Sequence, residues 1–230
     1  ADSAVMGANG KIVLKSSRTT LLEAGSTTSA RGTADGNLNT GGDIVLLGPQ
    51  VGLTGNAVVD ASGGAGGGTV LVGGDYQGRN AAVPNAQQAY VGRDSVIRAD
   101  ATGHGDGGKV IVWSDRATRV FGAISARGGA AGGNGGLVET SGHYLDMQGQ
   151  VDTRAPLGAT GTLLLDPSDI YIASDSGAAA AAGMTAGATP VNNGGVFMET
   201  GAVADSLLLT STLRNALATT DVTVSTANGA

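Results

Sequence analysis

The chain has 230 residues, 41 of them glycine, with 3% aromatic residues, no cysteine and a formal net charge of −6. An acidic chain without a cluster of Lys or Arg is not expected to bind nucleic acid, and a disulfide-stabilised fold is excluded. No apolar run is long enough to cross a bilayer as a helix. So few aromatic side chains would not fill the core of an ordinary compact domain, which favours a thin core of stacked aliphatic residues.

A glycine followed by a short alternating run recurs along the chain every 25 to 40 residues. The second residue after the glycine is apolar in every copy, and the fourth is apolar in all copies but one. Alternation with period two indicates a half-buried strand whose second and fourth residues point inward. The copies are Gly10–Lys15, Gly42–Leu47, Gly68–Gly73, Gly108–Trp113, Gly136–Ser141 and Gly161–Asp166.

A second, shorter strand also recurs, in which a large apolar residue, a polar residue and a small residue follow one another. Its copies are Leu21–Ala24, Val58–Ala61, Val96–Ala99, Ala123–Ala126 and Gln150–Thr153. Stacked repeats of this length, with glycine corners and no helical period, predict a parallel β-helix. We therefore expect an all-β, right-handed β-solenoid of about seven coils.

Interruptions of the repeat predict insertions at 73–89 and 173–193, because corners of such a stack tolerate extra residues. Residues 211–218 predict a short helix capped by Ser211, and a strand resumes at 221–226. Both ends of the stack would leave strand edges unpaired. Residues 1–230 are therefore expected to be a single segment of a longer protein.

Two stretches of the chain resemble a known family. The first comprises the segments Val110–Asp115, Phe121–Gly129 and Gly135–Gly142. The second comprises Val151–Pro156 and Gly161–Ile170. In this order they resemble the large exoproteins of bacterial two-partner secretion, the filamentous-haemagglutinin-like and haem–haemopexin-utilisation-like adhesins. The resemblance is close over most of residues 95–175 and looser elsewhere.

The resemblance implies a secreted protein at the bacterial cell surface, exported by an outer-membrane two-partner-secretion transporter. The amino-terminal secretion domain that docks on such a transporter is not recognisable in this chain, so that partner would bind a region absent from this sequence. The implied role is adhesion to a host receptor or to a matrix polysaccharide.

Four residues are candidate ligand contacts. Trp113 falls at an outward position of its strand, where an exposed indole can stack on a sugar or anchor a partner; the alternative is that an insertion or a neighbouring chain covers it. Tyr76 and Arg79 lie in the polar insertion at 73–89, and Tyr90 lies at its end. We expect this insertion to project from the stack and to present these side chains.

No catalytic or metal site is expected, and no cofactor. Asp60 and Asp152 lie on the outward stripe of the second strand, but at least two coils separate them, so a solvated charge ladder fits better than a glycosidase pair. The Gly103–Gly108 segment lacks the recurring aspartate of calcium-binding repeats. His104 and His143 are isolated in sequence, which gives little support to metal or haem ligation.

The expected function is thus a non-catalytic, adhesive stalk segment, with fibre formation by self-association as a second possibility. Two alternatives remain open. One is a polysaccharide-degrading enzyme on the same scaffold, which would need clustered acidic and basic groups on one face. The other is a haem- or haemopexin-capturing exoprotein, as the second branch of the resembled family implies.

Overall fold

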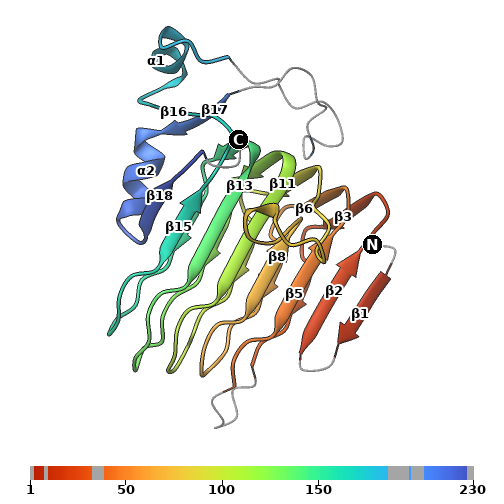
Figure 1. Ribbon diagram of the computed structural model, residues 1–230. Helices are drawn as coiled ribbons and strands as arrows, with labels where there is room; N and C mark the ends of the chain where they lie inside the picture. The colour runs from red at the N-terminus through yellow and green to blue at the C-terminus, as the bar shows by residue number, and fades with distance from the viewer. Residues whose placement is uncertain (1–2, 8–9, 33–38, 186–196, 198–204, 227–230) are drawn as a thin grey trace.

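The structure is a computed structural model that describes residues 3–7, 10–32, 39–185, 197 and 205–226. Most of the regular elements are strands, which run alongside one another (Figure 1). The strands are β1 (Ser3–Gly7), β2 (Lys11–Lys15), β3 (Thr19–Leu22), β4 (Thr27–Ser29), β5 (Asp43–Leu47), β6 (Gln50–Leu53), β7 (Val58–Asp60), β8 (Thr69–Val72), β9 (Gln88–Val91), β10 (Val96–Arg98), β11 (Lys109–Val120), β12 (Ala123–Ser125), β13 (Leu137–Met147), β14 (Gln150–Asp152), β15 (Thr162–Leu165), β16 (Ile170–Ala173), β17 (Ser206–Leu209) and β18 (Asp221–Val224). The helices are α1 (Ser176–Ala181), α2 (Thr210–Leu217) and a 3-10 turn, Tyr76–Gly78.

Equivalent positions of the first repeated strand stack on one another, as the sequence predicts. Ile44 pairs with Val70, Val70 with Val110, Val110 with Val138, and Val138 with Leu163, all in parallel strands. Each of these five side chains is fully buried. Because position two points inward in every copy, the side chains form one continuous aliphatic core.

The predicted fold class, an all-β right-handed parallel β-helix of about seven coils, is wrong. The structure is mostly parallel β with a few short helices. Its large sheet has eleven strands, and seven parallel strands lie along a nearly closed, barrel-like path in the order β2-β5-β8-β11-β13-β15-β18. An antiparallel strand, β1, adds to β2 at one end of this path.

The sheet bends in this way because its two long strands, β11 and β13, continue around a corner. The strand β11 pairs with β8 along its first half and with β9 along its second half. Its register with β13 shifts between Ser114 and Ala117. The Thr118 hydroxyl donates to the Ser141 carbonyl at 2.7 Å and bonds the Ser114 hydroxyl at 2.9 Å. These buried hydroxyls satisfy polar groups where the ladder is interrupted, so β11 continues as one strand and joins β8 and β9 in one sheet.

The second repeated strand builds a separate five-stranded parallel sheet in the order β14-β12-β10-β7-β4. Four of its members are the predicted ones. The fifth differs: β4, Thr27–Ser29, pairs with β7, whereas Leu22 of the predicted copy lies in β3 of the large sheet. The apolar signal at Leu22 is stronger than that of the threonines in β4, which explains why the sequence pattern selected the wrong segment.

Glycine corners allow the repeats to approach closely. A Cβ added to Gly108 would lie 2.0 Å from the carbonyl oxygen of Gly68, and one added to Gly136 would lie 2.0 Å from that of Gly108. No side chain fits at such a distance, so the glycines are required by backbone contact between adjacent repeats.

The predicted short helix at 211–218 is confirmed as α2, but its N-cap is Leu209, with no side-chain capping bond from Ser211. The helix lies against β14, and just beyond its end the Thr219 carbonyl accepts from the Thr153 N–H at 3.0 Å. The strand predicted at 221–226 is β18. The predicted insertion at 173–193 contains α1, and its part from residue 186 onward lies outside the described residues.

Candidate binding groove on the five-stranded sheet

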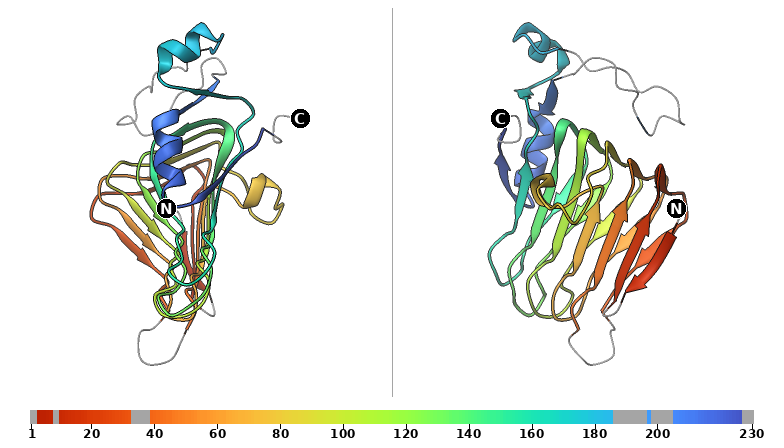
Figure 2. Two further views of the ribbon diagram at one scale, coloured as in Figure 1. Left: turned by 90° about the vertical axis from the view of Figure 1, so that its left-hand side faces the viewer. Right: turned by 45° about the vertical axis from the view of Figure 1, so that its right-hand side comes forward.

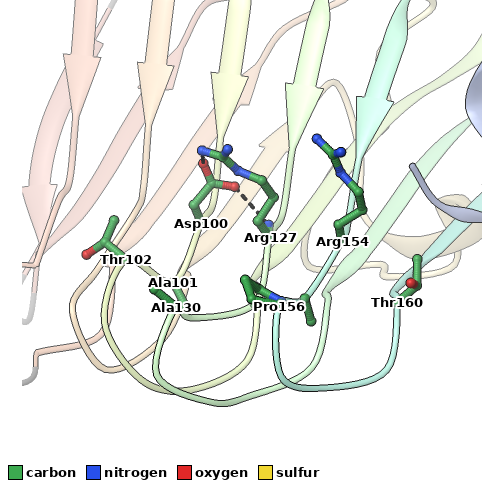
Figure 3. A pocket seen from close by; sticks show the side chains of 10 residues that line it. Asp100, Ala101, Thr102, Arg127, Ala130, Arg154, Pro156 and Thr160 are labelled. Atoms are coloured by element: carbon green, nitrogen blue, oxygen red, sulfur yellow. Dashed lines mark hydrogen bonds and ion pairs between the residues drawn. The ribbon is translucent and has the colours of Figure 1, made fainter. Parts of the chain in front are cut away.

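A groove of about 670 Å³ lies where the strands of the five-stranded sheet end (Figure 3). Its lining is polar on one side and small or apolar on the other. The lining residues are Asp100, Ala101, Thr102, Arg127, Gly128, Ala130, Arg154, Ala155, Pro156 and Thr160. A second hollow of about 420 Å³ shares Arg127 and Arg154 and continues toward α2. The two arginines therefore lie between two adjoining hollows.

The charged side of the groove comes from residues that stand at the same position after successive strands. The residue two places beyond the last residue of each strand points to this face, from β4 to β14. In strand order these residues are Arg31, Ser62, Asp100, Arg127 and Arg154. Parallel neighbours lie about 4.8 Å apart, so Arg127 and Arg154 stand side by side on adjacent strands, as Figure 3 shows.

Asp100 holds Arg127 in place. Its carboxylate is almost fully buried and accepts from the Arg127 backbone N–H at 2.8 Å, the Arg127 guanidinium at 3.0 Å and the Ser125 hydroxyl at 3.0 Å. The hydrogen bond to Asp100 raises the pKa of Arg127, so the guanidinium remains charged. Half of the Arg127 side chain is exposed, 51%, which leaves further N–H donors available to a ligand.

Asp152 holds Arg154 in the same manner. The Arg154 guanidinium donates to both carboxylate oxygens, at 3.0 and 2.7 Å, in a bidentate pair. Burial raises the pKa of Asp152, but the hydrogen bonds from the Arg154 side chain and backbone outweigh burial, and the pKa is lowered. Both arginines are thus oriented before any ligand arrives, which reduces the entropy lost on binding.

The two carboxylates weighed as a catalytic pair lie far apart. Asp60 is on β7 and Asp152 on β14, with β10 and β12 between them. Three strand spacings amount to about 14 Å, beyond the roughly 6.5–9.5 Å of an inverting glycosidase. Each also has its own arginine, since Arg31 lies 3.6 Å from Asp60 and Arg154 2.7 Å from Asp152.

Trp113 fits the alternative in which an insertion covers it. Its strand position does point outward, but the side chain is only 6% exposed because the insertion covers it. A Cβ added to Gly74 or Gly78 would lie 2.6 or 2.5 Å from the indole, so the backbone of the insertion lies directly on the ring. The insertion therefore folds over the large sheet, which corrects the expectation that it projects.

The other candidate contacts do not form one site. Tyr76 and Arg79 lie on the exposed side of the same insertion, Tyr76 at 43% exposure. Tyr90 belongs to β9, on another face, where its ring centroid lies 5.8 Å from that of Phe121. The Arg119 guanidinium lies 5.4 Å from the Phe121 ring, a cation–π distance. The insertion and Tyr90 therefore lie apart and do not form one binding site.

Sequence reasoning missed Arg127, Arg154 and Asp100. A signal was present, because each follows its strand by the same two positions, but the residue type at that position varies from copy to copy.

In the part of the chain that the structure describes, no three His, Cys, Asp or Glu side chains gather as metal ligands would. Nor do the described residues include a helix with the length and apolar character needed to span a membrane. No family model matches the sequence, and no curated protein matches it.

Proposed function

We propose that the chain is a non-catalytic, adhesive segment of a secreted bacterial surface exoprotein of the two-partner-secretion kind, and that its groove holds an acidic polysaccharide. The observation that supports this proposal is the pair of pre-oriented arginines, Arg127 and Arg154, on adjacent strands of an open groove. Planar guanidinium groups bind carboxylate and sulfate groups through paired hydrogen bonds.

The charge of the groove favours an anion. Across the groove and the second hollow, which adds Arg98 and Asp152 to the lining, three arginines face two aspartates, while the whole chain carries −6. A small positive region on an acidic surface directs an anionic ligand to one place. A polymer suits the shape, because the two hollows adjoin along the sheet and offer more length than a single sugar needs.

The non-catalytic assignment is supported by the way the acidic groups are used. Asp100 and Asp152 accept hydrogen bonds from arginines of the groove, so neither is placed to donate a proton to a ligand. Secretion by an outer-membrane transporter, a surface location, attachment to a host receptor and association into fibres rest on the sequence resemblance and remain parts of the proposal.

The test is binding of the purified chain to an array of acidic and neutral polysaccharides. Arg127→Gln and Arg154→Gln should each weaken binding to acidic polysaccharides by about tenfold, the usual scale for a lost charged hydrogen bond. Binding of the native chain should also weaken with added salt. Arg31→Gln is the matched control, since Arg31 has the same ladder position and a similar exposure, 57% against 59% for Arg154, but lies outside the groove.

Equal binding by the native chain and both groove variants would refute the groove assignment. A rise in reducing ends when the chain is incubated with the bound polysaccharide would instead favour the enzyme alternative. Capture of haemopexin or haem, with no polysaccharide bound, would favour the third interpretation of the resemblance.

A further inference from the structure

Residues 74–87, here called the strap, lie across the outer face of the large sheet, over β8, β11 and β13 (Figures 1 and 2). They leave the sheet at the end of β8 and return to it at β9. The strap is on a different face from the arginine groove, so any role of the strap is independent of the proposed polysaccharide site.

The strap covers an apolar stripe. Outward positions of successive strands hold Val45, Leu71 and Ile111, which with Trp113 belong to a second apolar cluster, and Val83 of the strap packs against it. These four side chains of the sheet are at most 6% exposed.

A buried carboxylate fastens the strap to the sheet. Glu139 occupies the next position of the same stripe, between its register partners Ile111 and Leu164, and its side chain is fully buried. Both of its oxygens accept from the backbone N–H of Gln77, at 3.2 and 3.1 Å. Gln77 has a φ of +53°, a left-handed conformation that a non-glycine residue keeps only when its surroundings hold it.

Two carboxylates, Asp75 and Asp166, act on Glu139, and a third, Asp115, holds the strap beside Trp113. From the strap comes Asp75, whose carboxylate is 3.0 Å from Nζ of Lys109 on β11. From the end of β15 comes Asp166, which accepts from the Gln77 side chain at 3.1 Å. Asp115 of β11 bonds Asn85 of the strap at 2.8 Å. Further carboxylates near a buried one disfavour its ionised form.

Burial of Glu139 decides whether acid favours or opposes docking of the strap. Burial raises the pKa of Glu139 to about 7; hydrogen bonds from Gln77 and Ser141 oppose this rise, and the charges of Asp166 and Asp75 add to it. An undocked strap would return Glu139 to water and to its ordinary pKa of 4.5. The docked state is therefore favoured most below pH 4.5, and this advantage is lost as the pH rises through 7.

We propose that the strap is a pH-dependent cover: it is held closed in acid and released as Glu139 ionises, which uncovers Trp113 and its apolar neighbours Leu71 and Ile111 on the outer face of the sheet. The closed state requires the fully buried Glu139 beneath Gln77, and the open state exposes the only tryptophan of the chain. The outer face of the sheet around Trp113 is thus covered at acidic pH and exposed near neutral pH.

Amide hydrogen exchange on the full chain tests the cover. After correction for the intrinsic exchange rate, protection of the strap amides should fall by up to about 70-fold between pH 5 and pH 8, the limit set by a pKa change from 4.5 to about 7. Quenching of Trp113 fluorescence by acrylamide should increase over the same range. In Glu139→Gln, protection of the strap should not depend on pH.

His104→Gln and His143→Gln are the controls, because histidine is the other side chain that titrates between these pH values. Both variants should keep the native pH dependence. Strap protection that stays constant from pH 5 to pH 8 in the native chain would overturn the proposal, and so would an unchanged pH dependence in Glu139→Gln. The native measurement decides the matter by itself should Glu139→Gln not fold.

Discussion

Gly78 lies flat against the indole of Trp113, so closely that a Cβ at position 78 would stand 2.5 Å from both Cε2 and Nε1 of the ring. Gly78 also has a φ of +62°, which side-chain-bearing residues rarely adopt. The lone tryptophan is thus both the platform on which the strap lies and the natural reporter of its position.

Gly78→Ala should displace the strap from Trp113. The added methyl meets a rigid ring and the left-handed backbone alone costs roughly 1–2 kcal/mol, so we expect the fluorescence of Trp113 to shift to longer wavelength and to become more easily quenched. Gly25→Ala is the control, because Gly25 has a φ of +80° but nothing within 4 Å of the added Cβ. That variant should be destabilised by a similar backbone strain and leave the Trp113 spectrum unchanged.

Gly108→Ala should destabilise the stack more strongly than any exposed substitution. A Cβ there would lie 2.0 Å from the Gly68 carbonyl oxygen, so two repeats must separate, at roughly 3 kcal/mol or more. Urea unfolding would measure the loss. Gly177→Ala in α1, whose nearest neighbour is Asp175 Oδ1 at 3.1 Å, should change the free energy of unfolding by less than about 1 kcal/mol. Equal effects of the two would contradict close backbone contact at Gly108.

Asp100→Asn should loosen the groove. One acceptor oxygen is lost from a buried group that serves Ser125 and both the backbone and the side chain of Arg127, which typically costs about 1–3 kcal/mol. Calorimetric or urea unfolding gives the stability change, and polysaccharide binding should weaken as Arg127 becomes mobile. Asp94→Asn, at an exposed position, is expected to stay within about 0.5 kcal/mol of the native chain.

Arg154→Gln should raise the pKa of Asp152, because burial then acts without the opposing bonds from the guanidinium. A carboxyl pKa that is lower in the folded than in the unfolded chain stabilises the fold at pH values above the unfolded pKa. This stabilisation is lost as the pH falls through the folded pKa. The variant should therefore lose less stability on acidification than the native chain. Carbon-detected NMR titration of the Asp152 carboxyl measures the shift directly, and Arg31→Gln should leave it unchanged.

Much of the core was predictable because side-chain alternation is a local property. Residues two and four places after each glycine face inward wherever a strand forms, so the stacking of Ile44, Val70, Val110 and Val138 could be predicted from spacing alone. The helix at 210–217 was also predicted from local sequence, within one residue at each end, although the predicted cap at Ser211 was not. Where local signals are weak, as in the threonines of β4, the wrong segment was chosen.

The sequence by itself determined that these repeats stack and which residues form their aliphatic core, since period and glycine spacing are written along the chain. Only the tertiary structure decided that β11 and β13 bend one sheet into a nearly closed path, that the strap covers Trp113, and that Arg127 and Arg154 meet in a groove. Each of these depends on pairing between residues tens of positions apart, such as Gln77 with Glu139. Local alternation cannot reveal which loop docks on which face, because that choice depends on burial and hydrogen bonding that exist only after the chain has folded.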